Sequence, residues 1–262
     1  MMTITKKLFG ATLLSFALAS SLAQAQERTI RFGSDATYPP FESTTPSGEI
    51  VGFDIDLAKA MCERLKATCT FQNQGWDGII PALRAKKFDV IASSMSVTPE
   101  RERAVAFTQK VWSIPNPLFG KKGLKAEPTK EGTKGLTIGV QQGVIQDVYA
   151  TKYFTEANIR RYKTFEDAAN DLVTGRLDAV FADSGVANQF LEGPRGQDYE
   201  VLGDPIPTSA DEAIFGKGTA FAVRKEDKEL LADLNRAFDE IRADGTYDKI
   251  AKEYFDYDVY DE

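Results

Sequence analysis

The stretch KFDVIASSMSVTPER, residues 87–101, decides the fold. Its apolar part predicts a buried strand over 88–95, of the kind that occurs in parallel sheets. Thr98 is a preferred N-cap and Pro99 suits the first helical position, so a helix is expected to begin there. Arg101 then falls in the first turn, where the helix dipole disfavours a cation. We therefore expect a negative group to lie opposite Arg101.

The alternative is that Arg101 is a surface residue that reaches back to Glu100 or Glu102. Helix N-termini attract anions, however, and three serine hydroxyls lie at the end of the strand before this helix. This combination favours an anion-binding role for Arg101.

Strands and helices alternate on both sides of this stretch. Strands are expected over 29–35, 69–74 and 88–95, and helices over 54–67, 76–87 and 98–105. The helix 54–67 has apolar residues at helical spacing, with Asp54 as its expected cap. The order strand–helix–strand–helix–strand predicts one α/β unit with a mostly parallel sheet.

A second unit follows after the segment 110–134, which is rich in proline, glycine and lysine. Strands are expected over 135–143, 158–164 and 176–184, and helices over 144–154 and 165–175. The last of these strands, RLDAVFADS, has the same pattern as KFDVIASS, so a second α/β lobe is predicted to begin near residue 113. Two amphipathic helices, 228–245 and 246–255, are placed back on the first lobe, which makes that lobe discontinuous.

Residues 1–25 have the features of a secretory signal peptide: two lysines, an apolar run and Ala23-Gln24-Ala25, with cleavage expected after Ala25. The apolar run is too short for a membrane anchor, and no later stretch approaches the length of a span. The remaining chain has 30 basic and 39 acidic side chains, a net charge of −9. This charge does not suggest nucleic acid or an anionic membrane as a partner.

The chain contains two cysteines, Cys62 and Cys69, and no histidine. In an exported protein this close pair is expected to form a disulfide rather than a metal site, and no metal or other cofactor is expected. The chain-entropy model gives roughly 2–3 kcal/mol for so small a loop. The lack of histidine excludes imidazole zinc sites and Ser-His-Asp catalysis.

Polar and aromatic side chains, together with one glycine and two aliphatic residues, gather where the expected strands end, which is where open α/β sheets bind ligands. They are Asp35, Tyr38, Trp76, Ser93, Ser94, Ser96 and Arg101 in the first lobe, and Gln141, Gly143, Val144, Ile145, Gln146 and Asp183 in the second. Each alone has a structural alternative, such as a turn cap, a core aromatic residue or a helix N-cap. Their common placement on two facing lobes favours one shared ligand site.

The chemistry of this set is complementary to a zwitterion. Arg101 can bind a carboxylate through two hydrogen bonds, assisted by backbone N–H groups at helix starts. Asp183 with the Ser96 hydroxyl suits an α-ammonium group. Asp35 is a second carboxylate beside the two aromatic side chains, and it suits a cationic ligand side chain through a salt bridge and a cation–π contact of roughly 0.5–2 kcal/mol.

Six segments resemble the periplasmic polar-amino-acid-binding proteins of ABC importers, especially the lysine/arginine/ornithine- and histidine-binding proteins. They are SDATYPPFES, GFDIDLAKAMCERLKATC, DGIIPALRAKKFDVIASSMSVTPERE, TGRLDAVFADS, FGKGTAFAVRKED and ADGTYDKIAKEYFDYDVY. The resemblance implies a type II periplasmic-binding-protein fold, with two α/β lobes joined by hinge crossings near 111–114 and 215–218. The lobes are then 26–112 plus 217–262, and 113–216.

The resemblance also implies a role for each site residue. Arg101 corresponds to the family's carboxylate-binding arginine, Asp183 to its ammonium-binding aspartate and Asp35 to its side-chain-binding aspartate. The aromatic sandwich falls on Tyr38 and Trp76, the serines on Ser93, Ser94 and Ser96, and the disulfide on Cys62 and Cys69. The implied function is that of a monomeric periplasmic receptor, not an enzyme. It would close on arginine, lysine, ornithine or histidine and deliver it to a membrane permease.

One loop departs from the family pattern. Where close relatives have an aliphatic residue and then Gln-Gly-Thr-Thr, this chain has QQGVI, residues 141–145. Gln141 is therefore polar, and Ile145 replaces a threonine that helps to hold the carboxylate. Trp76 is larger than the usual residue, which shrinks or flattens the side-chain pocket. The alternative ligands are an opine, citrulline or glutamine.

A periplasmic dehydratase on the same scaffold is a second alternative. It needs a general acid in the cleft, which in a chain without histidine is Asp, Glu, Lys or Tyr. The cleft residues named above are all used in zwitterion binding, and no glutamate is expected among them. A third alternative is a sensor-linked receptor that takes no part in transport.

Overall fold

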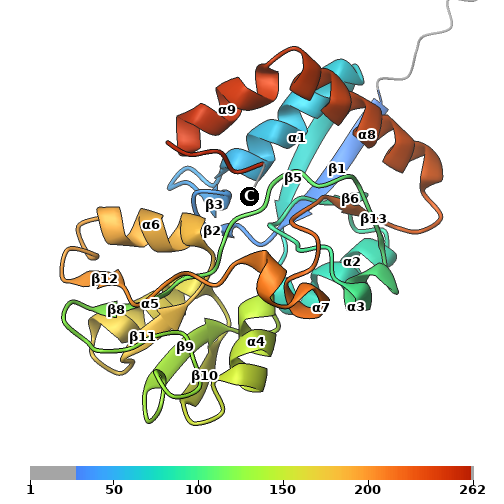
Figure 1. The fold of residues 1–262 in the computed structure, drawn as a ribbon. Helices are drawn as coiled ribbons and strands as arrows, with labels where there is room; N and C mark the ends of the chain where they lie inside the picture. Colours follow the sequence, from blue (N-terminus) through green and yellow to red (C-terminus); the bar gives the residue numbers. More distant parts are fainter. Residues whose placement is uncertain (1–27, 261–262) are drawn as a thin grey trace, which may run out of the picture.

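The computed structural model describes residues 28–260, and the predicted signal peptide lies outside this range. The chain folds into two α/β lobes, each built on a five-stranded sheet (Figure 1). No helix within the described residues is long and apolar enough to cross a membrane.

The sheet of the first lobe contains the strands predicted around residues 87–101. Its strand order is β5 (Ala67–Asn73), β1 (Arg28–Ser34), β6 (Val90–Ile91), β13 (Ala222–Val223) and β7 (Ala106–Phe107). β1 runs parallel to β5 and β6, whereas β13 runs antiparallel to β6 and β7. Helix α1 (Phe53–Arg64) leads into β5, and α2 (Ile79–Arg84), after the 3₁₀ turn η1 (Trp76–Gly78), leads into β6.

The second lobe repeats this arrangement. Its strand order is β10 (Asn158–Tyr162), β9 (Thr137–Gln141), β11 (Ala179–Phe181), β8 (Leu118–Lys121) and β12 (Tyr199–Val201). Its main helices are α4 (Ile145–Tyr153), α5 (Phe165–Val173) and α6 (Ser184–Glu192). The short helix α7 (Glu212–Phe215) follows the 3₁₀ turn η2 (Thr208–Ala210) and packs against α4. α5 buries Phe165, Ala168, Ala169 and Leu172, the i, i+3, i+4, i+7 spacing of an amphipathic helix.

Both sheets are mixed, which differs from the mostly parallel sheets that the sequence predicts. The parallel pairs lie within the strand–helix–strand units, as expected. β13 and β8 enter their sheets directly from segments that cross between the lobes, without a helical connection, and they run antiparallel to their neighbours.

The strand predicted over 88–95 is shorter in the structure, because β6 ends at Ile91. Ser94 has a φ of 50°, in the left-handed region that a strand excludes. Its N–H donates to Asp54 Oδ2 at 2.8 Å, and Trp112 Nε1 donates to Asp54 Oδ1 at 2.8 Å. The expectation that Asp54 caps α1 is therefore wrong: Gly52 is the N-cap, and the Asp54 carboxylate holds this loop.

A small sheet that the sequence analysis missed lies between the lobes. It consists of β2 (Thr37–Tyr38), β3 (Glu42–Thr44) and β4 (Ile50–Val51), and it contacts α1 of the first lobe and α5 of the second. Strands of two or three residues are too short for alternation of apolar and polar residues to be recognised.

Two extended segments cross between the lobes and pair with each other. Val111 N–H donates to Thr219 O at 2.7 Å, and Thr219 N–H donates to Trp112 O at 2.8 Å. Asn116 and Ile206 exchange both backbone hydrogen bonds, at 2.8 and 2.9 Å. The crossings therefore pair where Val111 and Trp112 meet Thr219, and Asn116 pairs separately with the segment that precedes η2 and α7.

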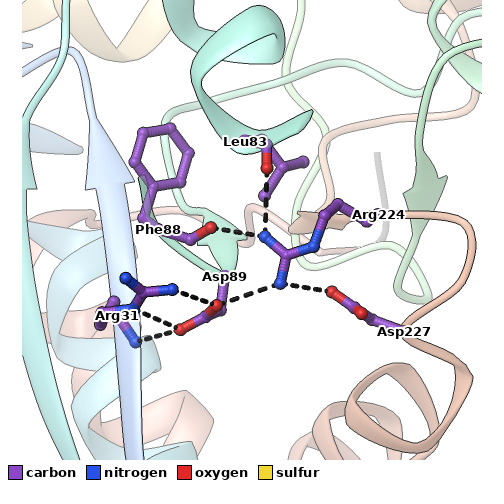
Figure 2. A network of polar contacts seen from close by, with 6 residues as sticks. All are labelled: Arg31, Leu83, Phe88, Asp89, Arg224 and Asp227. Atoms are coloured by element: carbon purple, nitrogen blue, oxygen red, sulfur yellow. Dashed lines mark hydrogen bonds and ion pairs between the residues drawn. The ribbon is translucent and has the colours of Figure 1, made fainter. Parts of the chain in front are cut away.

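The C-terminal helices α8 (Lys228–Ala243) and α9 (Thr246–Tyr254) pack against α1, over the first lobe (Figure 1). Arg224, between β13 and α8, fastens this return segment, as Figure 2 shows. Its guanidinium donates to Leu83 O at 3.1 Å and Phe88 O at 2.6 Å. It also pairs with Asp89 at 3.0 Å and Asp227 at 2.6 Å.

The predicted disulfide between Cys62 and Cys69 is confirmed, with the two Cα atoms 6.1 Å apart. It links the last turn of α1 to β5, the strand that α1 leads into.

Candidate functional site

A cavity lies where the carboxyl ends of β1, β6, β9 and β11 face each other across the two lobes. Its lining residues are Asp35, Tyr38, Glu42, Trp76, Ser93, Ser94, Ser96, Arg101, Gln141, Val144, Ile145, Gln146 and Asp183. The structure thus brings the residues predicted for the ligand site into one cavity, except Gly143, which does not line it. It adds Glu42, which the sequence analysis missed.

Arg101 provides the cationic wall of the cavity. It lies in the short helix α3 (Pro99–Glu102), and the Thr98 hydroxyl caps this helix by accepting from Arg101 N–H at 3.3 Å, as predicted. The guanidinium donates to Ser96 O at 3.1 Å, reaches Gly143 O of the second lobe at 3.5 Å, and lies 5.0 Å from the centre of the Trp76 ring.

The charge of Arg101 is unusual in its surroundings. Burial lowers the pKa of its guanidinium to about 10. Among residues 28–260 it forms no ion pair, and its predicted alternative partners Glu100 and Glu102 do not contact it through their side chains. Arg101 is half-buried, and a charge that is partly removed from water is costly unless it is paired, so this site favours an anion beside Arg101.

The start of α4 faces the same cavity from the second lobe. Val144 is its N-cap and makes no side-chain cap hydrogen bond, and both Val144 and Ile145 line the cavity. The first N–H groups of a helix have no intrahelical acceptor and carry a partial positive charge. The backbone here can therefore receive an anion even though Ile145 offers no hydroxyl.

Asp183 is the acidic side chain that lines the cavity from the second lobe. It occupies the N-cap position of α6, yet its carboxylate makes no cap hydrogen bond, which contradicts the structural alternative. Instead it accepts from Tyr38 Oη and, at 2.9 Å, from Gln146 Nε2. Burial raises the pKa of Asp183 to about 6, although these two donors oppose the shift. An ammonium group beside it would restore the ionised form.

Asp35 follows β1 and is held from three sides. Its N–H donates to Ser93 Oγ at 2.8 Å, and its carboxylate accepts from Thr37 Oγ1 at 3.1 Å and from Gln141 Nε2 at 3.0 Å. Burial raises the pKa of Asp35, and these two donors oppose the shift. The Gln141 bond joins the two lobes directly.

Glu42 overturns the expectation that no glutamate lies in the cleft. β2 and β3 pair with Tyr38 opposite Glu42, and this register turns the Glu42 side chain toward the cavity. Ser94 Oγ donates to its carboxylate at 3.1 Å and Ser93 Oγ at 3.3 Å. Burial, and then the nearby Asp54, raise the pKa of Glu42 well above its ordinary value.

The signal that would have located Glu42 is Pro39-Pro40. Two prolines between Tyr38 and Glu42 mark a turn, and a turn of this length brings Glu42 back beside Tyr38. The two serines predicted to contact the ligand have a further role here, because their hydroxyls position the Glu42 carboxylate.

Two lobes that meet around a buried cavity of charged and aromatic residues define a bilobal solute-binding protein. The model of one family, the bacterial extracellular solute-binding proteins, family 3, matches residues 30–257. The chain belongs to this family.

Relatives with known ligands cover nearly the whole chain. The histidine-binding periplasmic protein of Escherichia coli K12 is 44% identical over 250 residues, which is 94% of this chain and 95% of the relative. The lysine/arginine/ornithine-binding periplasmic protein of the same organism is 40% identical over 251 residues, 95% of each chain. The L-arginine-binding protein of Pseudomonas aeruginosa is 41% identical over 258 residues, 97% of this chain and 98% of the relative.

Solved structures agree with this fold. The periplasmic binding protein STM4351 of Salmonella typhimurium, described for its high arginine specificity, aligns with a TM-score of 0.81 at 34% identity, covering 87% of this chain and 99% of that one. An ancestral arginine-binding protein bound to arginine aligns with a TM-score of 0.79 at 34% identity, covering 87% and 98%. The relatives are solute-binding proteins, and this argues against a dehydratase although a glutamate does lie in the cleft.

Proposed function

We propose that this protein is the periplasmic receptor of an ABC transporter, and that it captures a cationic L-amino acid by closure of its two lobes. The observation that carries the proposal is Arg101: a half-buried guanidinium without an ion pair among residues 28–260, in a cavity that also contains three carboxylates. A zwitterion with a cationic side chain supplies the missing anion and two cations for those carboxylates.

Each part of the ligand has a matching group. The α-carboxylate is assigned to Arg101 and the first N–H groups of α4, and the α-ammonium group to Asp183 with Ser96. The side-chain cation is assigned to Asp35 and Glu42, and Trp76 and Tyr38 supply aromatic contacts. The names of the relatives support this assignment, since they bind histidine, arginine, or lysine, arginine and ornithine.

We assign closure to a rotation of the two lobes about the paired crossings. The first lobe comprises residues 26–112 and 217–262, and the second comprises residues 113–216. A ligand that contacts Arg101 on one lobe and Asp183 on the other favours the closed state by bridging them. The monomeric mature chain is expected to begin after Ala25 and to present its closed form to the transmembrane permease in the inner membrane. The periplasmic relatives support this location.

A neutral polar amino acid is the second candidate. Gln141 places an amide beside Asp35, and a relative of 34% identity, an ancestral arginine-binding protein, has been solved with glutamine bound. Glutamine and citrulline are therefore included in the test below.

Isothermal titration calorimetry on the ligand-free mature protein tests the proposal. We expect submicromolar binding of at least one of arginine, lysine, ornithine and histidine. Citrulline and glutamine are expected to bind more weakly. A ligand at 100 times its Kd also stabilises the fold by about 2.7 kcal/mol, which thermal unfolding detects. If none of these six amino acids binds or raises the Tm, the proposed function is wrong.

Replacing Glu42 by glutamine is expected to weaken L-arginine binding about tenfold and citrulline binding less than threefold. The amide keeps the shape and can still contact the two serines, but it cannot pair with a cation; tenfold corresponds to about 1.4 kcal/mol. Glu49→Gln, at an exposed position before β4, is the matched control. Equal losses for both ligands in Glu42→Gln would show that the carboxylate is structural.

Binding is expected to weaken as the pH falls below about 6. In the ligand-free protein Asp183 has a pKa of about 6, and an ammonium group lowers it, so binding at pH 5 displaces a proton. Because the pKa is raised in the folded state, protonation of Asp183 stabilises the ligand-free fold. This contribution is fully present below the unfolded pKa and is lost as the pH rises through about 6.

Calorimetry at pH 7.5 and 5.0, in buffers of different ionisation enthalpy, checks this pH dependence. We expect a loss of up to about tenfold per pH unit below 6 and release of up to one proton. Asp183→Asn should bind weakly at both pH values with a smaller difference between them. A wild-type affinity that is equal at pH 7.5 and 5.0 would contradict the assigned role of Asp183.

A further inference from the structure

Gln141 is one of the cavity residues that depart from the family pattern, and it contacts the acid assigned to the ligand side chain. It ends β9 in the second lobe, and Asp35 follows β1 in the first. Both side chains are buried, and Gln141 Nε2 donates to Asp35 Oδ2 at 3.0 Å and to Lys163 O at 3.3 Å. An amide NH₂ group has two hydrogens, so these two acceptors use both of them.

We propose that Gln141 is a specificity-determining residue that acts in two ways: as a latch that favours lobe closure, and as an internal competitor of the ligand for Asp35. This inference rests on the proposed function and refines it, because it concerns which side chain the receptor prefers. An aliphatic residue at this position, as the family pattern has, can do neither.

The latch follows from the position of the bond. Gln141 and Asp35 belong to different lobes, and their hydrogen bond forms only when the lobes are closed. It joins two protein groups, so it favours closure for every ligand alike. A receptor that is closed more often has a higher apparent affinity, since the measured Kd is the intrinsic value divided by the competent fraction.

The competition follows from the chemistry of Asp35. Its carboxylate already accepts from Thr37 Oγ1 at 3.1 Å and from Gln141, and both donors stabilise its negative charge. A ligand cation adds less stabilisation to a carboxylate that is already supplied with donors than to one that lacks them. The amide therefore reduces the advantage of a cationic side chain over a neutral one of the same shape.

For a cationic ligand the two effects act in opposite directions, whereas a neutral ligand is affected by the latch alone. Loss of the latch weakens both ligands. Loss of the competing donor strengthens the cationic ligand alone. L-arginine and L-citrulline are suitable probes, because their shapes are nearly the same. Arginine ends in a charged guanidinium group and citrulline in a neutral ureido group.

Titration calorimetry of Gln141→Met with both probes tests the proposal. Methionine keeps the length of the side chain and lacks the N–H groups. We expect the Kd of citrulline to rise about tenfold and that of arginine to change less than threefold, so that selectivity for the cation increases. Gln142→Met, the exposed neighbouring residue, is the matched control and is expected to leave both values unchanged.

A second variant covers the case in which Gln141→Met does not fold. Gln141→Glu has the same shape and places a carboxylate beside Asp35, which disfavours closure. Arginine is expected to lose much less affinity than citrulline, because its guanidinium can lie between the two acids. Equal factors for both probes in whichever variant folds would overturn the inference. Wild-type protein that binds neither probe nor any other amino acid would instead overturn the proposed function.

Discussion

Arg101→Ala is expected to abolish amino-acid binding, with a loss of at least a hundredfold for every ligand that carries an α-carboxylate. The guanidinium is the one cationic group among the described residues that line the cavity, so its removal leaves the ligand carboxylate without a charged partner. Truncating one member of a buried, hydrogen-bonded charge pair costs about 2–5 kcal/mol. Calorimetry at millimolar ligand measures the remaining affinity.

Two further variants make this result specific. Arg103→Ala removes an exposed arginine two residues away and should leave affinity unchanged. Arg101→Lys keeps the charge but loses the two-pronged geometry and the contact with the Trp76 ring, so an intermediate loss is expected. Near-native affinity in Arg101→Ala would show that the carboxylate binds elsewhere, and α4 would be the first place to look.

Most of the cavity could be predicted because it follows a rule about strand ends. Asp35, Trp76, Arg101 and Gln141 each come just after a recognisable strand or open a recognisable helix, and parallel strands direct such residues to one edge. The helix start at Thr98 and Pro99 was readable from local preferences alone.

Glu42 and the hydrogen bonds between the lobes were missed. They depend on very short strands or on residues far apart in the sequence, which sequence patterns do not show. Glu42 reaches the cavity through strands of two and three residues, β2 and β3. The bonds Tyr38–Asp183 and Gln141–Asp35 join residues more than a hundred positions apart. Such contacts depend on how closely the lobes approach each other, which local propensity does not determine.

The mixed sheets illustrate the same limit. Periodicity identifies a strand but not its direction, and the direction of β8 and β13 follows from the crossings between the lobes. Likewise β6 is two residues long rather than eight, because the Asp54 carboxylate holds the Ser94 N–H in a loop. In both cases tertiary structure overrides the local pattern.

Arg224→Met is expected to destabilise the fold by about 3–5 kcal/mol without changing ligand affinity. The side chain is 8% exposed, and its removal leaves Asp89, Asp227 and two backbone carbonyls without the donor that joins them (Figure 2). Leu83 and Phe88 are fully buried, and each buried carbonyl that loses its donor costs about 1–3 kcal/mol. Arg31 still pairs with Asp89 at 2.8 Å, and Asp227 is 23% exposed, so the loss comes chiefly from the two carbonyls.

Thermal and urea unfolding of the ligand-free protein measure this loss, and a Tm lower by about 6–20 °C corresponds to it. Arg236→Met is the matched control: Arg236 is 60% exposed, pairs with Asp233 within one helix, and should contribute less than about 1 kcal/mol. Asp89 precedes β6 whereas the cavity follows it, so the folded variant should bind with native affinity. A stability loss no larger than that of the control would mean that apolar packing of α8 and α9, rather than Arg224, holds the C-terminal segment on the first lobe.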